Sequence, residues 1–266
     1  MLTRIVFLLS AISGWKTTPC AGSGEGILPQ IDLTETDLLQ AIKIPFDDPT
    51  TTFFEDGLDK FPAMALKPGS DIKSPYRLYL PEKFYPEFAI TITAKLANRE
   101  GGFIFAVVNP LETVVQLGVH LTSAGPDMTN ISLLYTDLNI HFTSSQTIAS
   151  FVVPSTFSRW TRFALKVTME EVVLYFQCSE YGRLHVKRDT QELVFDSAST
   201  LYIAQAGPLI KGNLDGAIQQ LKIYGTPAVA ESQCKNSFKG FEEGSGDNYS
   251  TTPTWDPNDF FEFETT

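Results

Sequence analysis

The middle of the chain alternates apolar residues with small or polar ones in short runs. Residues 88–95 (FAITITAK) show this most clearly, because Phe88, Ile90 and Ile92 would share one face of an extended strand. The small and polar residues of the run would share the other face. The pattern therefore predicts a β-sheet whose core lies on the side of these three apolar residues.

Further runs of this kind follow, each short and rich in β-branched or aromatic residues. They span residues 102–108, 114–121, 131–135, 151–153, 162–167, 172–177, 200–205 and 217–224. Gly, Pro or charged residues interrupt the pattern between runs, as at Asn109-Pro110 and at 123–127. Connections this short favour antiparallel neighbours.

Helical periodicity is confined to residues 33–42, where three apolar residues would form one stripe after a cap at Asp32 or Thr34. Nine or more strands with one or two short helices predict an all-β fold, a two-sheet antiparallel sandwich. Immunoglobulin topology is disfavoured, because Trp160 precedes Cys178 and the sandwich has no cysteine upstream of that tryptophan.

The amino terminus has the pattern of a secretory signal peptide. Arg4 precedes an apolar run at 5–12 and the small residues Ser13 and Gly14. Cleavage is expected near this pair or after Ala21, and a buried amino-terminal strand is the alternative. The apolar run is too short to span a bilayer, and no later stretch approaches about 18 apolar residues, so no membrane span is predicted.

Composition and charge exclude several classes of protein. The chain has 266 residues, of which 43% are hydrophobic and 19% charged, an ordinary globular composition. The net charge of −11 argues against nucleic acid as a partner, because proteins that bind phosphates present basic surfaces. Glycine never recurs at every third position, so no collagen triple helix lies within these residues.

Three cysteines in a secreted chain leave one unmatched thiol. If Cys20 leaves with the signal peptide, Cys178 and Cys234 remain as a natural disulfide pair. Two buried free thiols are the alternative for that pair. If Cys20 is retained, a bond between chains becomes an option.

Several blocks of sequence, taken in order, carry a resemblance to a known family. They are GLDKFPA (57–63), Arg77, Leu80-Pro81, FAITITAKLANREGGFIFAVVNP (88–110), QLGVHLT (116–122), SRWTRFALKVTMEEVVLYFQC (158–178) and LDGAIQQLKIY (214–224). Together they resemble the thrombospondin N-terminal-like, laminin-G-like domain, and most closely the amino-terminal domain of the multiplexin collagens.

The resemblance implies a jelly-roll sandwich, secretion, residence in basement-membrane-associated matrix, and a disulfide bond between Cys178 and Cys234. It also implies interrupted Gly-X-Y repeats beyond Thr266, through which copies of the chain could assemble into a homo-oligomer. This chain ends before such repeats, as a fragment or a short form would.

The chain is expected to divide into four parts. They are a signal peptide (1–21), a short lead segment (22–31), the thrombospondin N-terminal-like domain (32–234) and an acidic, disordered linker (235–266). The linker contains seven aromatic residues, which either dock to a partner or reflect where the fragment ends.

Three sites of covalent modification are predicted. Asn130 and Asn248 each begin an N-x-S sequon, and Asn130 is expected at the exposed end of a loop. Ser245 lies in EEGSGD, a Ser-Gly pair between acidic residues, and is the predicted attachment site of a glycosaminoglycan chain. Ser23 is a weaker second candidate, and an ordinary flexible linker is the alternative.

One predicted strand, residues 162–167, would carry opposite chemistry on its two faces. If Phe163, Leu165 and Val167 pack in the core, Arg162 and Lys166 point outward. Outward cations could bind a sulfated polysaccharide, although the negative domain charge opposes this and a solvated face is the alternative. The candidate heparin patch comprises Arg159, Arg162 and Lys166, with Arg183, Lys187 and Arg188 as additions.

No catalytic, metal or cofactor site is predicted. The histidines His120, His141 and His185 lack metal-ligand spacing, and Glu170 and Glu171 are adjacent and so face opposite ways. No G-x-S-x-G elbow or phosphate-binding glycine loop occurs.

These observations favour a secreted, non-enzymatic structural and interaction module of the extracellular matrix. It would be the amino-terminal non-collagenous domain of a multiplexin-like collagen and a proteoglycan core, with matrix proteins or glycosaminoglycans as partners. The alternative is a lectin-like module that binds glycosaminoglycan, and a sandwich-fold glycosidase is a third class.

Overall fold

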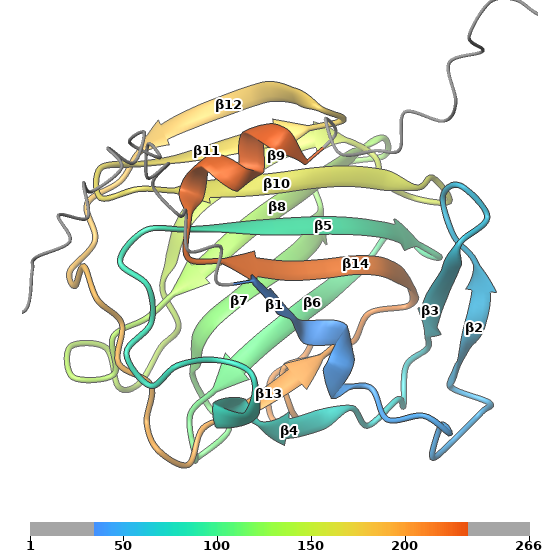
Figure 1. Ribbon diagram of the computed structural model, residues 1–266, viewed down its shortest axis with the longest axis horizontal. Coiled ribbons are helices and arrows are strands. Elements are labelled where there is room, and N and C mark those ends of the chain that lie inside the picture. Colours follow the sequence, from blue (N-terminus) through green and yellow to red (C-terminus); the bar gives the residue numbers. More distant parts are fainter. Residues whose placement is uncertain (1–34, 234–266) are drawn as a thin grey trace, which may run out of the picture. The chain divides into compact units, whose positions relative to one another are not determined.

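The computed structural model describes residues 35–233, which form two antiparallel sheets packed face to face around a shared apolar core (Figure 1). The eight-stranded sheet runs in the order β12 (Ser179–His185), β11 (Glu171–Phe176), β10 (Thr161–Val167), β5 (Phe88–Leu96), β14 (Gly216–Tyr224), β3 (Pro62–Leu66) and β2 (Thr52–Asp56), and β1 (Glu35–Asp37) also pairs with β14. The six-stranded sheet runs β4 (Lys73–Pro75), β13 (Thr200–Ile203), β6 (Gly101–Val108), β7 (Val115–Ser123), β8 (Met128–Tyr135) and β9 (Thr147–Pro154).

The interior between the sheets has the composition that the alternation predicts. Phe88, Ile90 and Ile92 of β5 have no exposed surface, and the inward apolar residues of β10 are at most 1% exposed. Aromatic rings fill one end of the core, where Phe84 lies 4.9 Å from the ring centroid of Phe88. The predicted two-sheet antiparallel fold and its core face are therefore confirmed.

The amino-terminal helix prediction needs correction. The chain enters as strand β1, with Glu35 opposite Tyr224 on β14, and only then forms the four-residue 3-10 helix η1 (Leu38–Ala41). The cap is Asp37, whose carboxylate accepts a hydrogen bond from the Leu39 N–H at 3.0 Å. Pairing with β14 replaces the first helical turn, so the helix starts later than the apolar stripe suggested. Two further 3-10 helices are η2 (Tyr76–Leu78) and η3 (Pro227–Ser232).

The alternation pattern does not predict five of the observed strands, which are β1, β2, β3, β4 and β12. In β2 two phenylalanines are adjacent, and β12 is almost entirely exposed, so neither strand has one apolar face. These strands form because neighbouring strands supply hydrogen-bonding partners, which a local pattern does not report.

The helix η3 lies over the outer face of the eight-stranded sheet, across β5 and β10 (Figure 1). Its Ala230 packs in a small apolar cluster with Ala89, Ala164 and Tyr224. This contact buries the middle of a face that would otherwise meet solvent, and it brings the helix next to the predicted basic residues. Within residues 35–233 no helix has the length and apolar character needed to cross a membrane.

Candidate functional site: the outer face of the eight-stranded sheet

Strand β10 presents its two cations on the outer face, as the sequence predicts. Arg162 and Lys166 are half-buried, while Phe163, Leu165 and Val167 face the core. Arg159 precedes the strand and is exposed. The predicted patch is therefore present in space, and its chemistry depends on what surrounds each cation.

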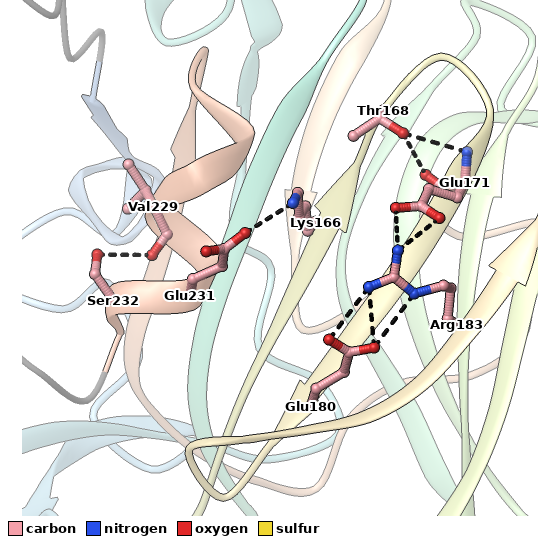
Figure 2. A network of polar contacts seen from close by, with 8 residues as sticks. All are labelled: Lys166, Thr168, Glu171, Glu180, Arg183, Val229, Glu231 and Ser232. Carbon is pink, nitrogen blue, oxygen red and sulfur yellow. Dashed lines mark hydrogen bonds and ion pairs between the residues drawn. The ribbon is translucent and has the colours of Figure 1, made fainter.

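Lys166 is paired with a carboxylate from the carboxyl-terminal helix. Its Nζ lies 2.7 Å from Oε1 of Glu231 on η3, and Figure 2 shows the two side chains facing each other. The hydrogen bond to Glu231 raises the pKa of Lys166 above its ordinary value. The ammonium group is thus kept charged and neutralised within the domain.

Arg162 is paired in the same way with the loop between β2 and β3. Its Nη2 donates to Oδ2 of Asp59 at 2.7 Å, across 103 positions of sequence. Because both cations of β10 already face carboxylates, a polyanion would have to compete with these ion pairs. We therefore expect the patch to bind heparin more weakly than the sequence alone would suggest.

Arg183 on β12, an addition to that patch, is held between two glutamates (Figure 2). Its Nη1 donates to both carboxylate oxygens of Glu171 at 2.7 and 2.9 Å, and its Nη2 donates to Glu180 at 3.1 and 3.3 Å. Hydrogen bonds between a guanidinium group and a carboxylate are shorter and stronger than those between neutral groups. They tie β11 to β12 at the edge of the sheet.

Arg188 does not lie on the surface patch at all. It is only 9% exposed, and its Nη2 donates to the carbonyl oxygens of Pro86 at 2.8 Å and Thr168 at 3.0 Å. Its guanidinium carbon lies 5.3 Å from the ring centroid of Tyr135. Burial therefore makes Arg188 a structural clamp between loops, while its neighbour Lys187 is exposed.

A shallow hollow lies beside the predicted patch, over β2, β3, β5 and β14. Its volume is ≈ 300 Å³, and small residues such as Ala65 and Gly216 line it. Lys95 lies 5.1 Å from the ring centroid of Trp160 and forms a 2.6 Å ion pair with Glu55. Aromatic and charged groups at one hollow can bind a small polar ligand. No local sequence pattern predicts this hollow, because its residues come from strands that are far apart in the chain.

Of the predicted glycan-attachment sites, only Asn130 lies within the described residues. Asn130 lies within β8 and is half-buried, which corrects its expected place at an exposed loop end. Its Nδ2 donates to Ser132 Oγ at 3.2 Å, and its Oδ1 accepts from Ser150 Oγ at 2.8 Å. The strand begins three residues earlier than the sequence suggests, because β9 continues to pair with it. Asn248, Ser245 and Ser23 lie outside the described residues.

Cys178 lies in the two-residue turn that joins β11 to β12. Gln177 and Cys178 both have positive φ, +48° and +72°, as a type I′ hairpin turn requires. Cys178 takes part in a disulfide bond. Its predicted partner, Cys234, and the third cysteine, Cys20, lie outside the described residues.

The histidines occupy three separate environments. His120 stacks on Phe103 at 4.0 Å between centroids, and burial lowers the pKa of its imidazole. His141 contacts Asp189 at 2.7 Å, whereas His185 is exposed on β12. Residues 35–233 contain no group of three His, Cys, Asp or Glu side chains arranged to hold a metal ion.

Fold and surface together define a class, a two-sheet jelly-roll sandwich of the laminin-G-like kind. Over 214 residues, 80% of its length, the chain is 30% identical to the human collagen alpha-1(XVIII) chain. The sequence resemblance is thereby confirmed: this is a thrombospondin N-terminal-like domain of the multiplexin collagen type. The chain spans about 12% of the length of that collagen.

Comparison with family models gives no match. Among solved structures, domain 4 of the arabinanase AbnA from Geobacillus stearothermophilus is similar, with a TM-score of 0.47, 17% identity, and coverage of 75% of this chain and 86% of that one. A pentraxin from Limulus polyphemus gives 0.43 and 14% identity, covering 56% of this chain and 69% of that one. These likenesses are too distant to indicate a function.

Proposed function

We propose that this protein is a secreted, non-enzymatic structural and interaction module of the extracellular matrix. In this proposal residues 32–234 are the amino-terminal non-collagenous domain of a multiplexin-like collagen, preceded by a signal peptide and followed by an acidic linker. The observation that carries the proposal is the 30% identity to a collagen chain across 80% of the sequence. Residence in the basement-membrane zone belongs to the same proposal.

The pairing of charges on the outer face supports this function over polyanion binding. Arg162, Lys166 and Arg183 each contact a carboxylate at 2.7 Å. A surface whose cations are neutralised from within suits contacts with matrix proteins, which rely on shape and local hydrogen bonds. Any glycosaminoglycan would then be carried by the protein on Ser245, in the linker, where basic partners could reach it.

A second candidate function is glycan binding by the domain itself. The hollow lined by Phe53 and Lys95 favours it, because an aromatic ring and charged groups from several strands meet there, and Lys95 also contacts the ring of Trp160. The exposed Arg159 lies next to that tryptophan in sequence.

A heparin column at physiological salt separates the two functions. We expect the domain to flow through, whereas retention would favour the second function. The variant Asp59→Asn with Glu231→Gln removes the carboxylates facing Arg162 and Lys166, and it should elute at higher salt than wild type. Its control, Asp127→Asn with Glu192→Gln, changes the net charge equally at other ion pairs. Equal elution of both variants would show that only net charge matters.

The main proposal is tested in cells that secrete matrix. The tagged chain should appear in the medium and in the insoluble matrix, and retention inside the cell would contradict the proposal.

The predicted covalent modifications are tested on the secreted protein. It should run as a smear that chondroitinase or heparinase sharpens, and Ser245→Ala should abolish the smear. Peptide-N-glycosidase should lower the mass if Asn130 or Asn248 is glycosylated, and non-reducing peptide mapping should recover Cys178 joined to Cys234.

A further inference from the structure

Strand β2 is a free edge of the eight-stranded sheet. It ends the strand order, and none of the strands in residues 35–233 pairs with its outer side (Figure 1). An edge strand exposes a row of unpaired N–H and C=O groups, to which another strand can pair.

The hydrogen bonds of the β2–β3 hairpin show which groups are available. The Lys67 N–H donates to the Thr51 carbonyl at 2.9 Å, and the Gly57 N–H donates to the Phe61 carbonyl at 2.7 Å. Bonding alternates along an antiparallel strand, so the odd-numbered residues of β2 bond to β3. The N–H and C=O groups of Phe54 and Asp56 therefore point away from the sheet. Pro62, which has no N–H, lies opposite Asp56 and agrees with this assignment.

The end strands of the two sheets differ in how many features obstruct pairing, and β2 carries the fewest. Strand β12 contains charged residues and a register shift against β11, and the hydroxyl of its Tyr181 donates to the Val152 carbonyl on β9 at 3.0 Å. Strand β4 has three residues and ends at Pro75, and β9 ends at Pro154. Strand β2 has five residues in unbroken register with β3, without lysine, glycine or proline, and its charged residues are Glu55 and Asp56 at its carboxyl end.

Apolar surface surrounds this edge. Phe54 is 49% exposed, Phe61 59% and Ile44 64%. Phe54 and Ile44 line a groove of ≈ 340 Å³, together with Leu39, Ile42, Pro62 and Met64. Exposed apolar side chains gathered at an unpaired edge mark an interaction surface.

We propose that a second copy of this chain pairs with β2, antiparallel, to form one sheet across two domains. The outward groups fix the register: Phe54 of each copy lies at the two-fold axis, and the two residues exchange both main-chain hydrogen bonds. Thr52 of one copy then lies opposite Asp56 of the other, and Phe53 opposite Glu55. The Thr52 N–H already donates to the Asp48 carbonyl of its own chain at 3.0 Å, so at this position only the Thr52 carbonyl is left to accept, from the Asp56 N–H of the other copy.

This register is self-complementary in charge and in apolar contact. It places no carboxylate opposite another, and it brings Glu55 of one copy near Lys67 of the other, because Lys67 lies 5.2 Å from the ring centroid of its own Phe53. The two Phe54 side chains meet on the groove side of the sheet, as cross-strand aromatic pairs do. A second copy is therefore the occupant that fits this edge. The inference is independent of the matrix function proposed above.

The test is sedimentation velocity of the full secreted chain, treated to remove glycans, across a dilution series. We expect a dimer that dissociates on dilution and that strengthens with added salt, because the copies repel each other: the 266-residue chain has a net charge of −11, and loss of the signal peptide removes the cations Arg4 and Lys16. Phe54→Lys should abolish the dimer. The control, Phe142→Lys, changes an apolar residue that is 72% exposed but lies outside β2, and it should leave the dimer intact. Asp56→Pro should also abolish the dimer, because it removes an outward N–H without breaking a bond to β3.

Three results would overturn the proposal. The first is a monomer at every concentration. If amide exchange at Phe54 and Asp56 were also slow in that monomer, another segment of the same chain would be covering the edge. The second is a dimer that Phe54→Lys leaves unchanged while thermal melting confirms the fold. The third is equal loss of the dimer in Phe54→Lys and Phe142→Lys.

Discussion

The two faces of strand β10 differ in what their side chains contribute. On the inner face, Phe163, Leu165 and Val167 pack in the apolar core, where their contribution is the removal of surface from water. On the outer face, Arg162 and Lys166 contact carboxylates at 2.7 Å and remain partly in water. Neighbouring residues therefore differ in their contribution to the free energy of unfolding. The inner face provides most of the stability, and the outer face provides charges that carboxylates of the same domain neutralise.

The largest effect is expected on the inner face. Leu165→Ala should lower the free energy of unfolding by about 2–5 kcal/mol, because it deletes buried methyl groups and leaves a cavity. Urea denaturation measures this loss. Arg162→Ala, three positions earlier on the outer face, is the control and should cost much less. Equal losses would show that the inner face does not dominate.

Arg188 breaks the simple division between apolar interior and charged exterior, because it is a buried cation. Arg188→Gln should cost about 1–3 kcal/mol, since the carbonyls of Pro86 and Thr168 would lose their donors. The exposed neighbour Lys187→Gln should change stability little. Parallel thermal melts compare the two variants, and equal melting points would contradict the structural role of Arg188.

A smaller effect is expected at the outer-face ion pair. Lys166→Gln should lower the free energy of unfolding by less than about 1 kcal/mol, because exposed ion pairs are screened by water and salt. The loss should shrink further when chemical denaturation is repeated at high salt. A loss that equals that of Leu165→Ala would overturn the comparison between the faces.

The smallest expected effect is on the pH dependence of stability. It involves His120, which is half-buried on the outer face of the six-stranded sheet. Burial lowers the pKa of its imidazole in the folded state below the ordinary value of about 6.5. Its contribution to stability is therefore complete above about 6.5 and is lost as pH falls, because the unfolded chain binds the proton first. His120→Gln should reduce this acid-dependent loss in melting temperature, whereas His185→Gln on the exposed strand β12 should not. Identical pH profiles for wild type and both variants would contradict the assignment.

Much of the fold follows from local sequence pattern. The runs at 88–95 and 162–167 place apolar residues on one face of a strand, and both strands form with that face inward. The blocks of similar sequence also identified the family, because they follow one another in order over most of the domain. Alternation with a period of two is a property of a single strand, so it can be read without knowing the neighbours.

The candidate site depended on information that local sequence does not contain. The carboxylate of Asp59 meets Arg162, and that of Glu231 meets Lys166, only after distant segments pack on β10. The burial of Arg188 likewise follows from the loops that enclose it. Sequence alone determined which residues alternate, which are charged and which family they resemble. The tertiary structure decided which charges meet and which edge remains unpaired, because both are set by contacts between segments far apart in the chain.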